Sequence, residues 1–361
     1  MLIPVILAAV AAVTQPAAPL SKPSWTRFTV PVAMDHVAVL SVDRGWGPKV
    51  DEKTTIVRSG HWQRETTVED GRVRIAIADL RSSKSVQFSQ QPDGAYASMN
   101  ISGIQESSEG VFVLTNASDV ALGETCKVWE FRWDGIVEQN CLTHDGIMLW
   151  QRVVGSSGIV LSSARTLSFS RTAVRSDAAA PPRDLFNLDA WGRWPARAPA
   201  GRNHHVRLVG PSSSNGRPVP TLDVRRVGEY WSTIETGHRG RNRTYASPAL
   251  RISVSEDASG RLRRLDVSRT EGSIPRPMFG VLKVATPDAP RNVLNEKCVN
   301  YTSTVTTFDY GELLCLTDDG VLLAKTTFSM GSGRFLAAAE LTRGKLTILD
   351  VTPQADILAK D

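Results

Sequence analysis

The sequence predicts a mainly β protein built from two tandem copies of one domain. Short runs rich in Val, Ile, Thr and Phe, such as residues 73–78 and 110–114, alternate with clusters of Gly, Asp, Asn and Pro, a pattern typical of strands and turns. Amphipathic helix patterns are scarce. One motif recurs, because residues 122–149 and 294–323 both carry Leu-x-Glu-x-Cys followed by Cys-Leu-Thr-x-Asp-Gly. We therefore expect a duplicated β domain.

Each copy of the motif predicts a meander of three strands. Apolar and polar residues alternate over residues 128–133, a period that suits a half-buried strand. Asp134-Gly135 is a favoured hairpin turn, and Asp145-Gly146 is a second one that leads into an apolar strand. Asp319-Gly320 occupies the equivalent position in the second copy. We expect the same meander twice.

The match between the copies continues downstream of the meander. A fixed offset of 175 residues aligns Ser157, Gly158, Leu161 and Ala164 with Ser332, Gly333, Leu336 and Ala339. A repeat of this length is far longer than a solenoid unit, so the copies are expected to be whole domains.

The four cysteines lie in pairs, one pair in each copy of the motif. Cys126 and Cys141 lie near the mouth of the first hairpin, and Cys298 and Cys315 occupy the equivalent places in the second. Cross-strand neighbours at such positions are close enough for disulfides, which we favour within each hairpin. Buried free thiols and a metal site are the alternatives, although neither pair has zinc-ligand spacing. No metal is expected.

The N-terminus is typical of an exported protein. Residues 1–13 are uniformly apolar, too short to span a bilayer, and are followed by a Gln-Pro-Ala-Ala-Pro break, which predicts a signal peptide over residues 1–18. Disulfides require an oxidising compartment, so we expect a periplasmic or secreted protein. The net charge of +5 is modest for 361 residues and does not favour nucleic-acid binding.

Composition divides the rest of the chain into two domains and a linker. Residues 191–218 are rich in Pro, Gly, Ser and Arg and show little apolar periodicity. We expect a first half-barrel domain over residues 25–190, a linker over residues 191–218 and a second half-barrel domain over residues 219–361. The arginines around the linker, together with Trp191, also favour peripheral contact with an anionic membrane surface.

The motif resembles that of a known superfamily. The chain is similar to the outer-membrane lipoprotein carriers and their periplasmic relatives, which often carry a Cys…Cys-x-Thr-x-Asp-Gly hairpin. The matching residues are Cys126, Cys141, Thr143, Asp145, Gly146, Ile147 and Leu149, and Cys298, Cys315, Thr317, Asp319, Gly320, Val321 and Leu323. The resemblance implies a curved antiparallel sheet that forms an open half-barrel in each copy, lined with apolar residues and covered by a few short helices.

Catalytic patterns are thin along the whole sequence. The chain has no Gly-x-Ser-x-Gly elbow, no Walker loop and no His-Glu-x-x-His motif. His144 is replaced by Asp318 in the second copy, which indicates an exposed turn residue. The adjacent pair His204 and His205 is weak as a metal site, and His61 has an ordinary strand-edge setting. We expect a protein that is not an enzyme and needs no cofactor.

One strand face of the first copy indicates a ligand. Large aromatic side chains on one face must be covered by a helix, by core residues or by an apolar ligand. The candidate ligand-binding residues are Trp129, Phe131, Trp133 and Trp150. The function that fits best is therefore a binding or carrier module of the envelope for an apolar or lipid-like ligand. The alternative is a structural or interaction scaffold that binds an envelope protein and no small molecule.

Overall fold

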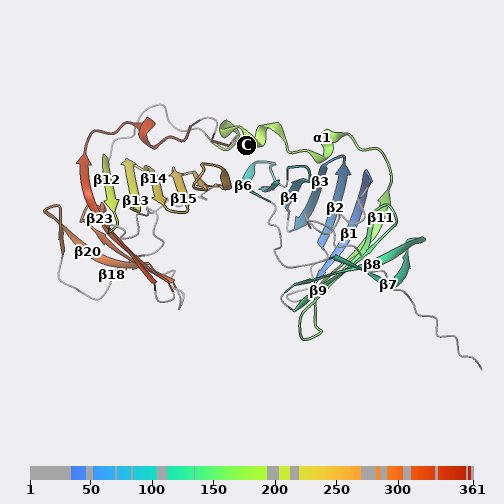
Figure 1. The fold of residues 1–361 in the computed structure, drawn as a ribbon. Coiled ribbons are helices and arrows are strands. Elements are labelled where there is room, and N and C mark those ends of the chain that lie inside the picture. Colours follow the sequence, from blue (N-terminus) through green and yellow to red (C-terminus); the bar gives the residue numbers. More distant parts are fainter. Residues whose placement is uncertain are drawn as a thin grey trace, which may run out of the picture. The chain divides into compact units, whose positions relative to one another are not determined.

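The structure is a computed structural model in which antiparallel strands dominate (Figure 1). It describes residues 34–45, 52–69, 71–82, 84–103, 112–133, 135–192, 203–211, 219–269, 282–284, 291–303, 310–329, 332–354 and 357–358. The predicted signal peptide over residues 1–18 lies outside them. The mainly β fold class is confirmed, and the described helices are short. None of the described helices is long and apolar enough to cross a membrane.

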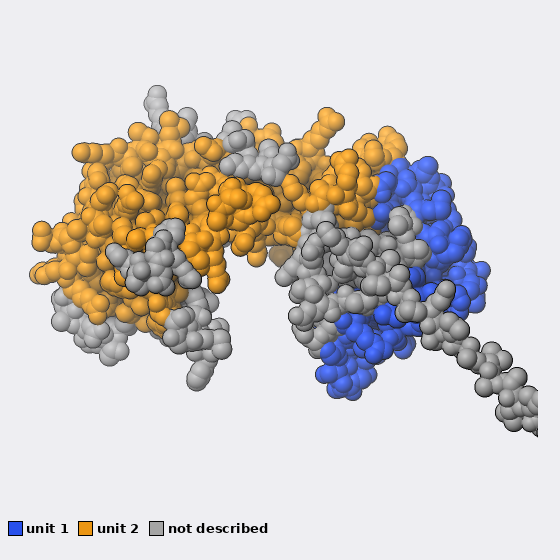
Figure 2. Space-filling model, in the orientation of Figure 1, with its two compact units in different colours: residues 1–60, 105–174 blue, residues 61–104, 175–361 orange. Residues whose placement is uncertain are grey.

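The chain forms two compact units, coloured separately in Figure 2. Unit 1 comprises residues 1–60 and 105–174, and unit 2 comprises residues 61–104 and 175–361. These units do not coincide with the predicted domains of residues 25–190 and 219–361. The first copy contributes strands to both units.

Unit 1 is one open antiparallel sheet. Its strands follow the order β2, β1, β11, β10, β9, β8, β7 across the sheet. The bounds are β1 His36–Arg44, β2 Glu52–Ser59, β7 Phe112–Ala121, β8 Glu124–Trp133, β9 Ile136–Leu142, β10 Met148–Val154 and β11 Val160–Ser170. The predicted meander is confirmed as β8, β9 and β10.

Unit 2 is a longer open sheet that contains strands of both copies. Its order is β3, β4, β5, β6, β17, β16, β15, β14, β13, β12, β23, β22, β21, β20, and β18 and β19 both pair with β20. The first-copy strands are β3 Trp62–Glu69, β4 Arg72–Asp79, β5 Lys84–Gln90 and β6 Tyr96–Gly103. The second-copy strands are β12 Asn203–Val209, β13 Thr221–Val227, β14 Tyr230–Gly237, β15 Gly240–Ala246, β16 Leu250–Glu256, β17 Leu262–Arg269, β18 Leu282–Val284, β19 Arg291–Val293, β20 Glu296–Ser303, β21 Tyr310–Leu316, β22 Leu322–Ser329 and β23 Ser332–Arg343.

The two copies meet where β6 pairs with β17. The ladder is antiparallel and runs from Ser98 opposite Ser268 to Ser102 opposite Arg264. Because β6 and β17 hold the same position in their respective copies, each copy offers the same edge strand to the other. The backbone groups of both edges are thereby satisfied, which protects two edges that would otherwise invite aggregation.

The largest buried cluster lies on one face of this junction. Strands β4 to β6 and β15 to β17 contribute residues such as Ile77, Ile252 and Leu265. The segments that close the two copies cover them, with Leu185 from the first and Leu358 from the second. The covering elements of the first copy are α1 Ser176–Ala179, η2 Arg183–Phe186 and η3 Leu188–Ala190, and the second copy has η4 Ile348–Val351 before its last residues.

The structure corrects the predicted linker over residues 191–218 at two places. Trp191 is 1% exposed, stacks on Tyr96 with ring centroids 5.3 Å apart, and donates its indole N–H to the carbonyl oxygen of Leu185 at 2.9 Å. Asn203–Val209 is strand β12, which pairs with β13 on one side and β23 on the other. Burial of alternate apolar side chains outweighs the polar composition of the flanking residues.

The structure also corrects the alignment of the copies downstream of the meander. Ala164 pairs with Gln151 in the first copy, and the equivalent Lys325 pairs with Leu336. The offset there is therefore 172 residues, and Ala164 corresponds to Leu336 rather than to Ala339. The hairpin between β22 and β23 is shorter than its counterpart, which shifts the register of everything that follows.

Candidate functional site

Both predicted disulfides are present in the meanders. Cys126 on β8 is bonded to Cys141 on β9, and Cys298 on β20 is bonded to Cys315 on β21, each with Cα atoms 5.3 Å apart. All four sulfurs belong to residues that are at most 3% exposed. The pairing within each hairpin is confirmed, and neither a free-thiol nor a metal reading remains for these cysteines.

The aromatic residues predicted to bind a ligand lie in different surroundings. Phe131 is 5% exposed, and Trp129 is half-buried against an apolar cluster that includes Leu40, Leu142 and Met148. Trp150 packs against a different cluster, which contains both disulfide cysteines of the first copy, and donates its indole N–H to Asp119 at 2.9 Å. The side chain of Trp133 lies outside the described residues. Trp129 and Trp150 pack against separate clusters, so these two side chains do not form one surface.

The turn that follows Cys141 is built by its own polar residues. The hydroxyl of Thr143 accepts from the backbone N–H of Ile147 at 2.9 Å and donates to the Asp145 carboxylate at 2.5 Å. Gly146 has a φ of 83°, the left-handed conformation that glycine adopts without strain. Thr317, Asp319 and Gly320 reproduce the same turn in the second copy. The shared Thr-x-Asp-Gly sequence thus codes for a specific local structure.

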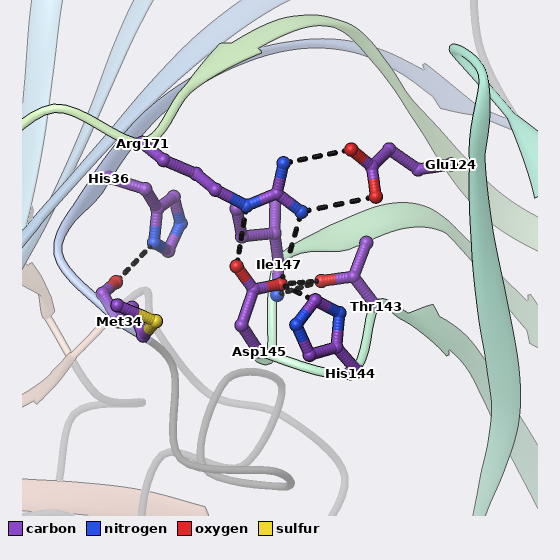
Figure 3. Close-up of polar contacts among 8 residues, drawn as sticks. All are labelled: Met34, His36, Glu124, Thr143, His144, Asp145, Ile147 and Arg171. Carbon is purple, nitrogen blue, oxygen red and sulfur yellow. Dashed lines mark hydrogen bonds and ion pairs between the residues drawn. The ribbon is translucent and has the colours of Figure 1, made fainter.

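An arginine that follows β11 ties this turn to the neighbouring hairpin (Figure 3). The guanidinium of Arg171 donates through Nε to Asp145 at 2.6 Å and through Nη1 and Nη2 to Glu124 at 2.8 and 3.2 Å. Glu124 is the glutamate of the Leu-x-Glu-x-Cys motif. Arg343 binds the equivalent residues Asp319, through Nη1, and Glu296, through Nη2. We call each set an arginine latch.

The latch leaves no free proton acceptor. Hydrogen bonds from Arg171 hold the pKa of Asp145 at about 2, against its usual 3.8, although burial opposes the shift. The same contacts raise the pKa of Arg171. In the second copy, hydrogen bonds from Thr317 and Arg343 lower the pKa of Asp319 against the larger opposing effect of burial. Charges that are fully paired in this way hold elements together and do not abstract protons.

The histidines singled out in the sequence are not gathered into a site. The His144 side chain is 85% exposed at the tip of the turn. His205 lies on β12, with Nε2 3.0 Å from Asp223, and its neighbour His204 is buried. A different histidine, His36, is 2% exposed and donates from Nδ1 to the carbonyl oxygen of Met34 at 2.7 Å. Burial lowers the pKa of His36.

Among the described residues, no group of three or more His, Cys, Asp or Glu side chains could hold a metal ion. The Asp and Glu residues of the latches have arginine as their partner instead. The chemistry of these positions is that of ion pairs.

A polar groove crosses the junction of the two copies on the face opposite the buried cluster. Its volume is about 600 Å³, and both copies line it, through β3 to β6 and through β17. The residues that carry polar side chains are Glu65, Thr67, Arg72, Arg74, Gln87, Ser89, Ser98, Asn100, Asp266 and Ser268. Sequence reasoning missed this groove, because the pairing of β6 with β17 joins residues more than 160 positions apart.

The groove side chains are ordered by contacts with one another. The hydroxyls of Ser89 and Ser98 lie 2.6 Å apart, and Asn100 donates to Asp266 at 2.5 Å. Arg264 adds two bonds to the same carboxylate, at 2.7 and 3.1 Å. The Asp266 carboxylate is therefore already satisfied, and the groove offers hydrogen-bonding groups in fixed positions rather than a free base.

Comparison with known proteins gives distant likenesses only. Neither a protein-family model nor a curated protein matches the chain. The structure of MucB from Pseudomonas aeruginosa in complex with MucA is 13% identical over 67% of this chain and 90% of that chain, with a TM-score of 0.24. PNGF-II is 9% identical over 86% of this chain and 96% of that chain, with a TM-score of 0.31. An uncharacterised conserved protein from Thermus thermophilus is 13% identical over 45% of this chain and 93% of that chain, with a TM-score of 0.30. Resemblances this weak carry no argument about ligand or activity, and membership of the carrier superfamily stays a prediction.

Proposed function

We propose that the chain is an exported binding module of the cell envelope that performs no chemistry, and that its two copies together form a scaffold for one extended polar partner. The observation that carries the proposal is the ladder between β6 and β17. This ladder joins strands β3 to β6 of the first copy to the second copy in one sheet, and a groove crosses it. A binding surface to which both copies contribute residues would require the duplication.

The groove suits a polar segment of a partner protein. Its serine, threonine and asparagine side chains offer both donors and acceptors, and Arg72 and Arg74 add positive charge at one side. An extended peptide presents N–H and C=O groups at regular intervals and matches such a surface better than an acyl chain does. The partner expected from this chemistry is an extended, polar segment of an envelope protein.

The disulfides support an extracytoplasmic site of action. Two bonded cysteine pairs persist only where the environment is oxidising. The apolar start of the sequence supports the same compartment. Periplasmic or secreted location is therefore part of the proposal.

A second candidate function rests on Trp129. This side chain is half-buried beside small and flexible apolar residues, among them Ala38, Ala164 and Met148. An apolar or lipid-like ligand that displaced water from this cluster would gain about 0.8 kcal/mol per buried methylene. The first copy would then be a carrier, as the aromatic face of its sequence predicts.

Site-specific photo-crosslinking separates the two candidates. A photoreactive amino acid is placed at Ser98 in the groove, at Lys127 on β8 two residues before Trp129, or at the exposed Leu349 in η4 as the control. Adducts formed in intact cells are then weighed by mass spectrometry. We expect a discrete protein adduct from Ser98 and none from Leu349. Lipid-sized adducts from position 127 alone would favour the carrier, and equal labelling at all three positions would refute a groove partner.

A further inference from the structure

A second cavity, of about 490 Å³, lies within the second copy and is rich in arginine. It lies beside the hairpin between β14 and β15, and the residues that line it come from β14 to β17, from β23 and from Pro220 just before β13. The charged residues that line it are Arg239, Arg241, Arg263, Arg334, Glu235 and Glu256. Two positive charges are therefore in excess, with His238 counted as neutral. The volume is in the range of small-ligand sites.

The two glutamates hold part of the arginine cluster in place. Arg241 donates twice to Glu256, at 2.9 and 2.8 Å, and the buried Arg243 binds the other oxygen of the same carboxylate. Arg334 donates through Nη1 to Glu235 at 2.7 Å. Both oxygens of Glu256 are thus occupied by arginines, so this carboxylate is not available to repel an anion directly.

Several donors remain unused after these pairs are formed. Nη2 of Arg334 is buried and has no hydrogen-bond partner within the described part of the chain. Arg239 and Arg263 are exposed, and no ion pair with another described residue involves either of them. A buried donor without a partner costs free energy, so a ligand that accepts a hydrogen bond there is favoured.

The first copy has different charged residues in the equivalent region, where Arg72 and Arg74 correspond to Gly240 and Asn242 of the cavity. The pairing of the strands shows which residues of the two copies are equivalent. Arg241 of β15 pairs with Glu256 of β16, and the equivalent residues Val73 of β4 and Gln90 of β5 pair in the same way. By the same pairing Glu235 corresponds to Thr67, Arg263 to Ala97 and Arg334 to Ser162. These five equivalents, Val73, Gln90, Thr67, Ala97 and Ser162, are uncharged. The charges therefore do not serve the common fold, which the first copy builds without them.

We propose that this cavity binds a phosphate group, either a free phosphate monoester or the headgroup of a phospholipid. Guanidinium groups match phosphate geometry and form charge-assisted hydrogen bonds with it. Arg239 and Arg263 supply the charge, and Nη2 of Arg334 supplies the desolvated donor. The site is independent of the groove at the junction and requires none of its residues.

The test compares one double variant with one matched control in the full chain. Arg239→Gln with Arg263→Gln removes the two unpaired charges at exposed positions, where the fold does not depend on them. The control, Arg251→Gln with Arg261→Gln, removes the same charge from the same copy at positions that do not line the cavity. Binding of inorganic phosphate is followed by ³¹P line broadening, and binding to vesicles by co-sedimentation with phosphatidylcholine, with or without phosphatidic acid.

We expect saturable binding that the Arg239/Arg263 variant weakens by about tenfold or more and that the control leaves within about twofold, as removal of charge-assisted bonds predicts. Binding of inorganic phosphate supports a soluble source, and binding of phosphatidic acid vesicles without inorganic phosphate supports a headgroup. The proposal is overturned if neither probe binds the native chain, or if the control variant loses as much affinity as the cavity variant.

Discussion

Arg171 donates to the carboxylate of Asp145 at 2.6 Å, and this contact connects the end of β11 to the turn before β10. The Asp145 side chain is 5% exposed, whereas its counterpart Asp319 is 34% exposed. The two latches therefore pair the same residue types but differ in burial and in the guanidinium atoms that they use. Because an unpaired charge costs more where water is excluded, the copies should respond differently to the same substitution.

The first prediction concerns the loss of each latch arginine. Arg171→Ala should lower the free energy of opening around the 143–147 turn by about 3 kcal/mol, since it leaves a buried carboxylate without its partner. Arg343→Ala should cost about 1 kcal/mol or less, because its partners are more exposed. Hydrogen exchange of peptides that cover the two turns measures both values in one sample. Equal losses in the two copies would show that burial does not set the strength of the latch.

The second prediction concerns pH. The pKa of Asp145 is about 2 in the folded chain, below its usual 3.8. A depressed pKa gives stability that is present above pH 3.8 and is lost as pH falls through about 2. We expect a loss of roughly 2 kcal/mol between pH 4 and pH 2 from this group. Asp145→Asn should be less stable at pH 7 but should lose less over that interval, as followed by thermal unfolding. An unchanged pH slope in this variant would contradict the assignment.

The third prediction concerns backbone strain at the hairpin before each first cysteine. Leu122 has a φ of 54° and Leu294 a φ of 50°, a left-handed conformation that costs a leucine about 1 kcal/mol. Leu122→Asn should raise the unfolding free energy by about that amount, because asparagine tolerates this conformation. Leu122→Ala keeps the penalty and serves as the control. A gain of equal size in both variants would mean that the exposed leucine side chain, and not the backbone, is unfavourable.

The fourth prediction concerns the disulfides. The two bonds close loops of 15 and 17 residues, for which the chain-entropy estimate is roughly 3 kcal/mol each and differs between them by only about 0.1 kcal/mol. Replacing Cys126 and Cys141 by alanine should therefore destabilise the first meander as much as the equivalent change destabilises the second. Chemical denaturation with hydrogen exchange on each meander gives the two values. A large inequality would indicate strain or residual unfolded-state structure in one copy.

The fifth prediction concerns Trp191. Its ring lies in the buried cluster at the junction of the copies and is 1% exposed. Trp191→Ala should destabilise unit 2 by about 3 to 5 kcal/mol, in the range for deletion of a large buried aromatic. Trp150→Ala, at a half-buried position, is the comparison and should cost less. If Trp191 instead behaved as a linker residue, its removal would leave the thermal midpoint unchanged.

Local sequence patterns were sufficient to predict the meander and its disulfides. The alternation over residues 128–133, the Asp-Gly turns and the cysteine positions all depend on neighbours within about 17 residues along the chain. Such contacts are encoded by short-range sequence, and the structure reproduces them. The strand β12 was missed because Gly, Pro and Ser on either side concealed a short alternating stretch between them.

The latches and the groove could not be predicted in the same way. Arg171 stands 26 residues from Asp145 and 47 from Glu124, and the sequence around it has no distinctive pattern. Its repetition as Arg343 becomes visible only with the corrected offset of 172. The groove depends on the pairing of two edge strands. Such pairing is set by tertiary packing, which the local periodicity of the sequence does not reveal.

The pairing of β6 with β17 has a further consequence for how such a chain arises. An ancestor with a single copy would expose this edge, and two such molecules would associate through it by a symmetric contact. Fusion of two copies makes the same association intramolecular, so that it no longer depends on protein concentration. Symmetry is then no longer enforced, because a substitution in one half is not repeated in the other. The arginines of the second copy, which correspond to Val73, Ala97 and Ser162 in the first, are the kind of one-sided change that a homodimer cannot acquire.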